Sequence, residues 1–187
     1  MKPVFSIITV VYNGGSLLEG TIESVLQQTY PHIEYILVDG ASKDKSLDII
    51  RAAEAHSARV RWISEPDKGL YDAMNKGLAL ATGDFVWFLN AGDHLHASDT
   101  AEKVAACITD RTDVLYGETI LVNDLREPAG TMSELSTRSL PEHLQWKSYL
   151  GGMLVVHQSF IARRELAPLY MQKNMCADYD WCIHILK

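Results

Sequence analysis

The chain has 187 residues, 47% of them hydrophobic and 22% charged, which is typical of a single globular domain with a substantial core. Its formal net charge is −7 at pH 7, from 17 basic and 24 acidic residues, and this acidity argues against nucleic acid or an anionic membrane face as a partner. Three cysteines are an odd number without metal-type spacing, and they predict reduced thiols in a cytosolic protein.

The first half of the chain alternates apolar β-branched runs with helical patterns, which predicts an α/β fold with βαβ units and a mostly parallel sheet. Strands are predicted at residues 4–11, 33–38, 60–64 and in the apolar part of 83–89. Helices are predicted at residues 17–26, 45–55 and 70–81. The apolar run at 4–11 is too short to span a bilayer and is followed by Asn13 and two glycines, so no targeting signal is expected.

The second half, after Gly117, changes character. A helix at 98–107 and a strand at 113–116 lead into it, followed by predicted turns at 123–124 and 128–130, a helix that starts at Pro141 and a strand at 154–156. Without a repeat or a flexible linker, residues 1–187 are expected to form one domain. The final residues 178–187 carry no glycine C-cap or stop signal, which predicts a chain that lacks its usual final helices.

Four polar loops, at residues 12–15, 39–42, 65–69 and 90–93, follow the first four predicted strands. In an open α/β sheet ligands bind at the carboxyl ends of the strands, so four polar loops at one edge favour a binding site over four unrelated turns. The loops contain neither the Gly-x-Gly-x-x-Gly fingerprint of dinucleotide binding nor a lysine-containing phosphate loop. A nucleotide would therefore be bound in another way.

Two of these loops carry acidic residues that could bind a ligand. Asp93, beside Asn90 and a glycine, offers the hard oxygen ligands that Mg²⁺ or Mn²⁺ prefers, although an ordinary turn explains the same residues equally well. Asp39 is placed to accept a hydrogen bond from a base edge or a ribose hydroxyl. Its alternative role is an Asx turn made with Ser42.

An ordered series of motifs carries a resemblance to a known family. The segments SIITVVYN at 6–13, SVLQQTY at 24–30, LVDGASKD at 37–44 and EPDKGLYDAMNKG at 65–77 resemble family 2 glycosyltransferases, and the last resembles the subgroup of bacterial surface polysaccharide synthesis. The resemblance implies the GT-A fold, an α/β/α sandwich like that of nucleotide-diphospho-sugar transferases, with a nucleotide-sugar half at 1–93 and an acceptor half at 94–187.

The resemblance also implies an activity. It is inverting transfer of a sugar from a nucleotide-sugar donor, with a UDP-sugar favoured, to a glycan or lipid-linked acceptor. A divalent metal, Mn²⁺ or Mg²⁺, would neutralise charge on the diphosphate. The protein would be cytoplasmic, and lipid-linked acceptors leave peripheral association with the inner membrane face open.

Carried over by position, the donor-binding residues are Thr9, Tyr12, Asn13, Asp39, Lys68, Asp72, Asn75, Asn90 and Ala91. The family's metal motif is Asp-x-Asp, whereas this chain has Asn90 and Asp93, so Asp93 becomes the principal metal ligand. Asp72 could equally be a solvated carboxylate favoured by the helix dipole, and Lys68 a solvated loop charge. Asn75 is unfavourable inside a helix unless its side chain finds a partner.

The catalytic base is expected near the carboxyl end of the chain. The segment CADYDW at 176–181 resembles the family's late acidic motif, with Ala177 where a glutamate is usual. Asp178 takes the base position, Asp180 is the fallback, and a helix N-cap is the structural alternative for Asp178.

His157 and Gln158, placed directly after the predicted strand at 154–156, are assigned by resemblance to donor phosphate or acceptor. A structural or surface role is the alternative.

Two other classes compete with an active transferase. A sugar nucleotidyltransferase should show a glycine-rich loop with Arg and Lys after the first strand, and residues 13–16 lack both basic residues. A non-catalytic module that only binds a nucleotide sugar remains compatible with the departures at Asn90 and Ala177.

Overall fold

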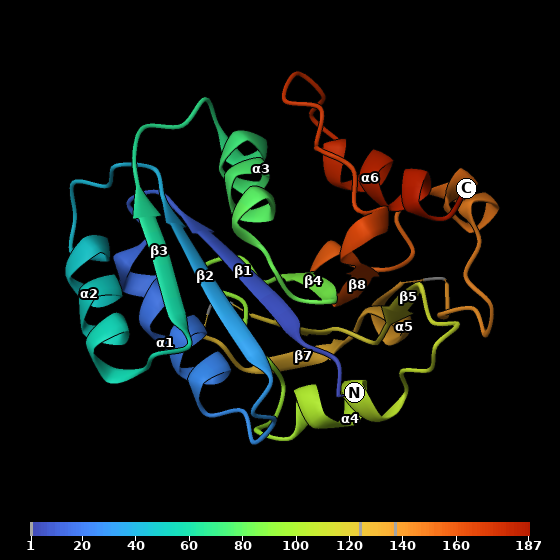
Figure 1. Cartoon of the computed structure of the whole chain (residues 1–187). Helices are drawn as coiled ribbons and strands as arrows, with labels where there is room; N and C mark the ends of the chain where they lie inside the picture. Colours follow the sequence, from blue (N-terminus) through green and yellow to red (C-terminus); the bar gives the residue numbers. More distant parts are fainter. Residues whose placement is uncertain (1, 124, 137) are drawn as a thin grey trace.

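The computed structural model describes residues 2–123, 125–136 and 138–187, so Asp124, part of a predicted turn, lies outside the described residues. A six-stranded sheet with the order β3-β2-β1-β4-β8-β5 forms the centre of the molecule (Figure 1). Its strands are β1 (Phe5–Val11), β2 (Ile33–Asp39), β3 (Val60–Ser64), β4 (Phe85–Phe88), β5 (Val114–Tyr116) and β8 (Phe160–Arg163). A separate hairpin consists of β6 (Ile120–Val122) and β7 (Pro128–Thr131).

Helices cover both faces of the sheet, which confirms the predicted α/β/α sandwich. The α-helices are α1 (Gly15–Leu26), α2 (Ser46–His56), α3 (Leu70–Leu80), α4 (Thr100–Ala106), α5 (Met132–Leu135) and α6 (Ala177–Ile185). Three short 3₁₀ helices are η1 (Trp146–Gly151), η2 (His157–Ser159) and η3 (Arg164–Leu166). Helices α1, α2 and α4 pack on one face, and α3 and α6 pack on the other.

The central strands are apolar throughout because both of their faces are covered. All seven residues of β1 are buried, and the side chains alternate: Ile7 joins the core under α1 and α2, whereas Ile8 joins the core under α3 and α6. Parallel strands covered on both faces show such continuous apolar runs. The parallel pairing of β1 with β2 and β4, and of β2 with β3, is therefore what the sequence predicts.

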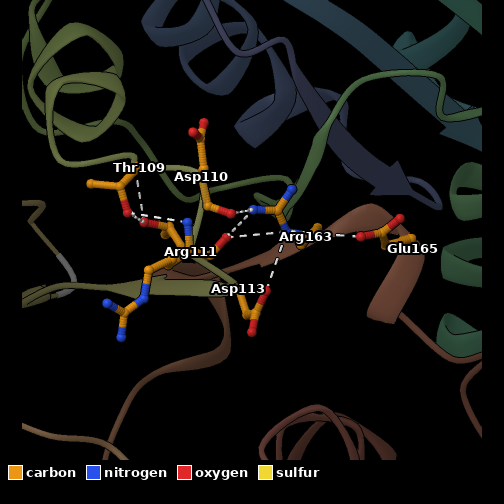
Figure 2. A network of polar contacts seen from close by, with 7 residues as sticks. Thr109, Asp110, Arg111, Asp113, Arg163 and Glu165 are labelled. Carbon is orange, nitrogen blue, oxygen red and sulfur yellow. Dashed lines mark hydrogen bonds and ion pairs between the residues drawn. The ribbon is translucent and has the colours of Figure 1, made fainter.

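Strand β8 departs from this parallel pattern, since it runs antiparallel between β4 and β5. Arg163 at its end holds the start of β5: its Nη2 donates to the carbonyl oxygen of Thr112 at 2.6 Å, and its Nε lies 3.3 Å from Oδ1 of Asp113 (Figure 2). The guanidinium also lies over the ring of Phe85 in β4, 5.3 Å from its centroid. One side chain thus joins three neighbouring strands.

Three predictions for the second half are wrong. Residues 154–156 are not a strand, because β8 starts only at Phe160. Residues 128–130 belong to strand β7 rather than to a turn, and Pro141 starts no helix. Strand β7 pairs with β6 in a local hairpin, and β8 pairs with β4 and β5, which lie far away in the sequence, so the pairing partner decides which segments become strands.

Among the helices that the described residues form, none is long and apolar enough to cross a bilayer.

Glu34 joins three strands at the amino edge of the sheet. Its carboxylate accepts hydrogen bonds from Ser6 Oγ of β1 (2.6 Å), Arg61 Nη1 of β3 (2.7 Å) and the backbone and hydroxyl of Thr82 (2.9 Å each). Burial alone would raise the pKa of Glu34, but the hydrogen bonds from Ser6, Thr82 and Arg61 outweigh it and the pKa is lowered. The charged form is therefore the one that the fold stabilises.

We expect Glu34→Gln to lower the free energy of unfolding by about 2 kcal/mol at pH 7, because hydrogen bonds to a charged side chain that is only 12% exposed are lost. Since the folded pKa lies below the unfolded value, this contribution is present above the unfolded pKa and disappears as pH falls through the folded one. Urea unfolding at pH 7 and pH 3 measures both effects. Glu54→Gln, at an exposed position of α2, serves as the control, and an equal loss in the two variants would contradict this role.

Candidate functional site

The four polar loops converge at the carboxyl edge of the sheet, as expected. Loops 12–15 and 39–42 are tied together: the backbone amide of Asn13 donates to Ser42 Oγ at 2.8 Å, and the amide of Lys43 donates to Asn13 Oδ1 at 2.7 Å. Asn13 and Ala41 both have positive φ, 52° and 62°. Left-handed conformations of non-glycine residues cost energy and gather at functional sites, so these loops have the character of a binding site.

Asp39, at the end of β2, is fully buried, and its carboxylate is satisfied by protein donors. It accepts from the backbone amide of Ser42, at 3.1 Å to the nearer oxygen, and from Ser64 Oγ at 2.6 Å. The predicted Asx turn is therefore present.

The backbone beside Asp39 forms a narrow floor at Gly40. A Cβ added to Gly40 would collide with the carboxylate of Asp67 and lie 3.3 Å from the ring of Tyr12. Tyr12 is 65% exposed, so a large aromatic ring stands open above this floor. An exposed aromatic face can stack on a flat ring.

Thr9 lies deeper in the core than a direct contact with a nucleotide-sugar donor would need. It is fully buried, and its hydroxyl donates to the carbonyl oxygen of Leu89 at 2.6 Å and lies 3.0 Å from the hydroxyl of Tyr35. Its observed role is to hold the end of β4 against β1, and so to fix where the loop at 90–93 begins.

The loop at 90–93 is a tight turn in which the amide of Asp93 donates to the carbonyl oxygen of Asn90 at 2.9 Å. Gly92 has φ of +107°, and its amide donates to Thr21 Oγ1 at 2.9 Å, which anchors the turn, with Ala91, on α1. The predicted turn is therefore present, and it carries Asn90 and Asp93 at its two ends.

The oxygens of this turn suit a divalent cation. Asn90 Oδ1 is buried and has no hydrogen-bond partner within the described residues, and half-buried Asp93 has a pKa that burial raises against the opposing effects of His94 and the Asn90 backbone. A bound cation would satisfy the first and charge the second. No group of three or more His, Cys, Asp or Glu that could hold a metal occurs in the described chain, so further ligands would come from a donor diphosphate and water, as is common for Mg²⁺.

Helix α3 begins at the same edge and carries Asp72 and Asn75, and Lys68 lies just before it. Asp72 Oδ2 accepts from the backbone amide of Lys68 at 3.0 Å, and Oδ1 accepts from Gln172 Nε2 at 2.7 Å. The side chain is 16% exposed, so it is not the solvated carboxylate that one reading of the sequence predicted. Lys68 lies in the exposed loop before the helix.

The side chain of Asn75 has the hydrogen-bond partner that an asparagine inside a helix needs. Its Nδ2 donates to the carbonyl oxygen of Tyr170 at 3.0 Å, and its Oδ1 accepts from the Tyr170 amide at 2.7 Å. Both ends of the amide are therefore used to hold residue 170, and a donor contact would need one of these bonds to be exchanged.

Asp178 lies in the first turn of α6, half-buried, with its Oδ1 3.1 Å from the hydroxyl of Tyr71. Because Tyr71 belongs to the first turn of α3, this contact places Asp178 near the loop at 65–69, at the carboxyl edge of the sheet. The N-cap of α6 is Cys176, without a side-chain cap, so the predicted alternative of Asp178 as N-cap is wrong.

Asp180 faces away from Asp178, as residues two apart on a helix do. Its Oδ2 lies 3.4 Å from Nδ1 of His184. It also borders a small cavity of about 120 Å³ between α6 and residues 168–171. Within this structure, Asp178 is the carboxylate of the pair that joins the edge.

His157 and Gln158 precede a strand rather than follow one. His157 is 3% exposed, and its Nε2 lies 2.8 Å from the hydroxyl of Tyr170. Burial lowers the pKa of His157 to about 4, with Asp178 opposing. Gln158 is half-buried, and its carbonyl oxygen accepts from Trp87 Nε1 at 2.7 Å. The contacts that the structure shows for both residues are to aromatic side chains of the core.

Sequence reasoning missed Tyr71 and Asp67. Tyr71 contacts Asp178 across 107 positions of sequence, and Asp67 covers Gly40. For Asp67, its place in a polar loop after β3 was an available signal, whereas no local pattern indicates the contact of Tyr71.

Comparisons with known proteins agree with this geometry. A model of the protein family described as Glycosyl transferase family 2 matches residues 6–167. A protein of Mycobacterium bovis named PGL/p-HBAD biosynthesis glycosyltransferase is 40% identical over 188 residues, which covers 97% of this chain and 69% of the relative.

Solved structures show the same fold at low sequence identity. S. aureus TarS 1-349 in complex with UDP-GlcNAc matches with a TM-score of 0.77 and 20% identity, over 98% of this chain and 53% of that one. The mannosyltransferase PcManGT from Pyrobaculum calidifontis, in complex with GDP-Man and Mn²⁺, matches with a TM-score of 0.71 and 17% identity, over 99% of this chain and 52% of that one. The chain thus spans about half the length of these structures.

We expect His157 to make stability fall in acid. Its folded pKa of about 4 lies below the ordinary histidine value of 6.5, so the neutral ring is stabilising above pH 6.5 and that contribution is lost as pH falls towards 4, by about 3 kcal/mol in total. His157→Gln keeps a hydrogen-bonding group near Tyr170 without this titration. Denaturant unfolding at pH 7, 5.5 and 4 should show a smaller acid loss in the variant than in the parent, and parallel losses would contradict the assignment.

Proposed function

The chain belongs to glycosyl transferase family 2, and we propose that it is an inverting enzyme that transfers a sugar from a nucleotide-diphosphate sugar, with a UDP-sugar favoured, to a glycan or lipid-linked acceptor. The observation that carries this proposal is the meeting of three features at one sheet edge. These are the floor at Gly40 beside Asp39, the oxygen pair of Asn90 and Asp93, and the carboxylate of Asp178.

The donor half of the site would be organised around the first two loops. The base would lie against Tyr12 and Gly40, with Asp67 as an acceptor for its amide-type N–H groups. Asp39 would accept from the base once one of its bonds to Ser42 or Ser64 is exchanged, and Asn13 would fix the two loops relative to each other. Lys68, at the entrance of α3, supplies a positive charge near the expected diphosphate. The solved complexes with UDP-GlcNAc and GDP-Man support a nucleotide sugar as the ligand class.

Asp93 and Asn90 would hold Mn²⁺ or Mg²⁺. The cation supplies Lewis-acid stabilisation of the leaving diphosphate when it is bound. The chain's own contribution is to present one carboxylate and one neutral oxygen on a turn fixed to α1. The Mn²⁺ of the mannosyltransferase complex supports this assignment.

Asp178 would act as the general base. It accepts the proton of the acceptor hydroxyl while that oxygen forms a bond to the anomeric carbon. The bond from this carbon to the β-phosphate oxygen breaks, and its electron pair leaves with the nucleoside diphosphate. One displacement inverts the anomeric centre. General-base catalysis of this kind contributes roughly 10²–10⁴ in rate.

The acceptor would belong to bacterial surface glycan synthesis. The Mycobacterium bovis relative, named for PGL/p-HBAD biosynthesis, supports a cell-surface product. Exposed apolar side chains at Leu169, Met171 and Met175 precede α6 and the base, which suits an acceptor with an apolar part, and we propose a cytoplasmic protein that works at the inner face of the membrane.

A thermal-shift panel of UDP- and GDP-sugars with and without Mn²⁺ tests the donor and the metal together. A true donor at about 100 times its Kd should stabilise the parent by roughly 2.7 kcal/mol. We expect Asp93→Asn to lose most of the increment that depends on Mn²⁺, because the only carboxylate of the turn is neutralised, and to keep the part that does not. Stabilisation by Mn²⁺ and donor that is the same in both proteins would remove Asp93 from the metal site.

The base is tested by nucleotide release from the best donor of the panel. Asp178→Asn should lower turnover roughly 10²–10⁴-fold with little change in donor Kd. The control Asp110→Asn, at an exposed position far from Asp178 in the sequence, should leave turnover unchanged. A larger loss in Asp180→Asn than in Asp178→Asn would transfer the role to Asp180. Donor binding without any nucleotide release by the parent would instead favour a non-catalytic binding module.

A further inference from the structure

Three side chains of one face of α3 hold the irregular segment that leads into α6. Asn75 binds both backbone groups of Tyr170, Asp72 binds the side chain of Gln172, and the hydroxyl of Tyr71 lies 3.1 Å from the carbonyl oxygen of Met175 and 3.1 Å from Asp178 Oδ1. We call Tyr71, Asp72 and Asn75 the α3 clamp. In Figure 1 both α3 and α6 lie above the same face of the sheet.

We propose that Tyr71 is a positioning residue for Asp178. Its single hydroxyl proton has two acceptors at 3.1 Å, the carbonyl oxygen of Met175 and Oδ1 of Asp178, and it is donated to the charged carboxylate, which is the stronger acceptor and keeps Oδ2 to receive the proton of the acceptor hydroxyl. This inference rests on the proposed function, because it assigns a task to the base. Within the described chain no other side chain donates to Asp178, so the Tyr71 hydroxyl is the one side-chain group that selects the orientation of the carboxylate.

The hydroxyl of Tyr71 is itself held in place. Its ring stacks on Tyr170 with centroids 5.7 Å apart and an angle of 16°, and Tyr170 stacks in turn on Trp181 at 5.1 Å and 12°. Tyr170 cannot shift easily, because its hydroxyl contacts His157 Nε2 at 2.8 Å and Asn75 grips its backbone. The Tyr71 ring therefore stacks on a residue that is fixed on its other side by Trp181, and a hydroxyl held in this way positions its acceptor with little loss of entropy during the reaction.

The chemistry of the surrounding groups favours a neutral positioning residue. The ionisable groups that face Asp178 are Tyr71, Tyr170, His157 and Cys182. Burial raises the pKa of the first two and of Cys182 and lowers that of His157, so all four are uncharged near neutral pH. No ion pair to Asp178 forms in the described part of the chain. A neutral hydroxyl orients the carboxylate, whereas an adjacent cation would also weaken it as a base.

Tyr71 links the loop at 65–69 to the segment that carries Asp178. Tyr71 stands one residue before Asp72, in the first turn of the helix that follows the donor-side loop at 65–69. Docking of residues 168–176 on the α3 clamp therefore brings the base to the donor side. Both halves of the sequence must meet before Asp178 has its orientation.

The test is Tyr71→Phe, which keeps the stacked ring and removes only the hydroxyl. We expect kcat for nucleotide release, with the UDP-sugar that stabilises the parent most, to fall roughly 10- to 100-fold, with KM and donor Kd within about twofold of the parent. The matched control is Tyr30→Phe, which removes a hydroxyl bonded to the carbonyl oxygen of Pro3 at the opposite edge of the sheet. It should lower stability and leave kcat unchanged.

A double-mutant cycle separates positioning from a merely structural effect. If Tyr71 acts through Asp178, Tyr71→Phe has no further effect on kcat in the Asp178→Asn background. A kcat of Tyr71→Phe equal to that of the parent, or an equal loss in both backgrounds, overturns the inference.

The proposed function can fail independently of this inference. A parent that releases no nucleotide removes the proposed activity, and full activity of Asp178→Asn removes the proposed base. Activity that depends on Asp178 but not on the Tyr71 hydroxyl removes only the positioning role.

A measurement that needs no turnover tests the contact between Tyr71 and Asp178 directly. Burial, and then the charge of Asp178, raises the pKa of Tyr71, so Asp178→Asn should lower that pKa. Titration of ¹³Cζ-labelled tyrosine by NMR measures it, and an unchanged Tyr71 titration would show that the contact is absent in solution.

Discussion

Parallel pairing of β1 with β2 and with β4 is the constraint on which the rest of the molecule depends. The registers Val11 with Asp39 and Ile8 with Phe88 bring the last residues of three strands to one edge. The hydroxyl of Thr9 adds a bond to the carbonyl oxygen of Leu89, so the end of β4 cannot slide along β1. A shift of one residue would turn every buried side chain of these strands to the other face. The register of the buried strands therefore determines where the polar loops lie.

This dependence explains why the first half of the fold could be predicted from the sequence. Strand β3 matches its predicted bounds, and the other elements up to α3 agree within a few residues, because each is specified by a continuous apolar run or by helical spacing. In the second half the apolar run at 154–156 and strand β8 carry similar residues. What selects β8 is its antiparallel place between β4 and β5, with Arg163 bonded to Thr112 and Asp113. Pairing partners so far apart leave no local signal.

The residues of the candidate site also fall into those whose place the local sequence predicts and those whose place it does not. The positions of Asp39, Asn90 and Asp93 at the carboxyl edge could be predicted, because Asp39 ends a buried strand and the other two lie within five residues of the end of another. Asn75 and His157 were also assigned to the site by resemblance, but their observed partner is Tyr170, a residue in an irregular segment. That segment is ordered by aromatic stacking with Tyr71 and Trp181, which depends on the completed fold. Residues that resemble donor ligands in sequence can thus also support the segment that leads to Asp178.

The replacement of a carboxylate by Asn90 has a physical consequence for the proposed donor site. Burial already raises the pKa of Asp93, and a second buried carboxylate beside it would raise it further by like-charge repulsion. Asn90 avoids that repulsion but also halves the negative charge offered to a cation, and its Oδ1 has no partner in the described chain. A cation with one charged protein ligand needs the oxygens of the diphosphate to complete its coordination. Under the proposed function, metal and donor therefore bind with positive coupling, and each raises the affinity for the other by the same factor.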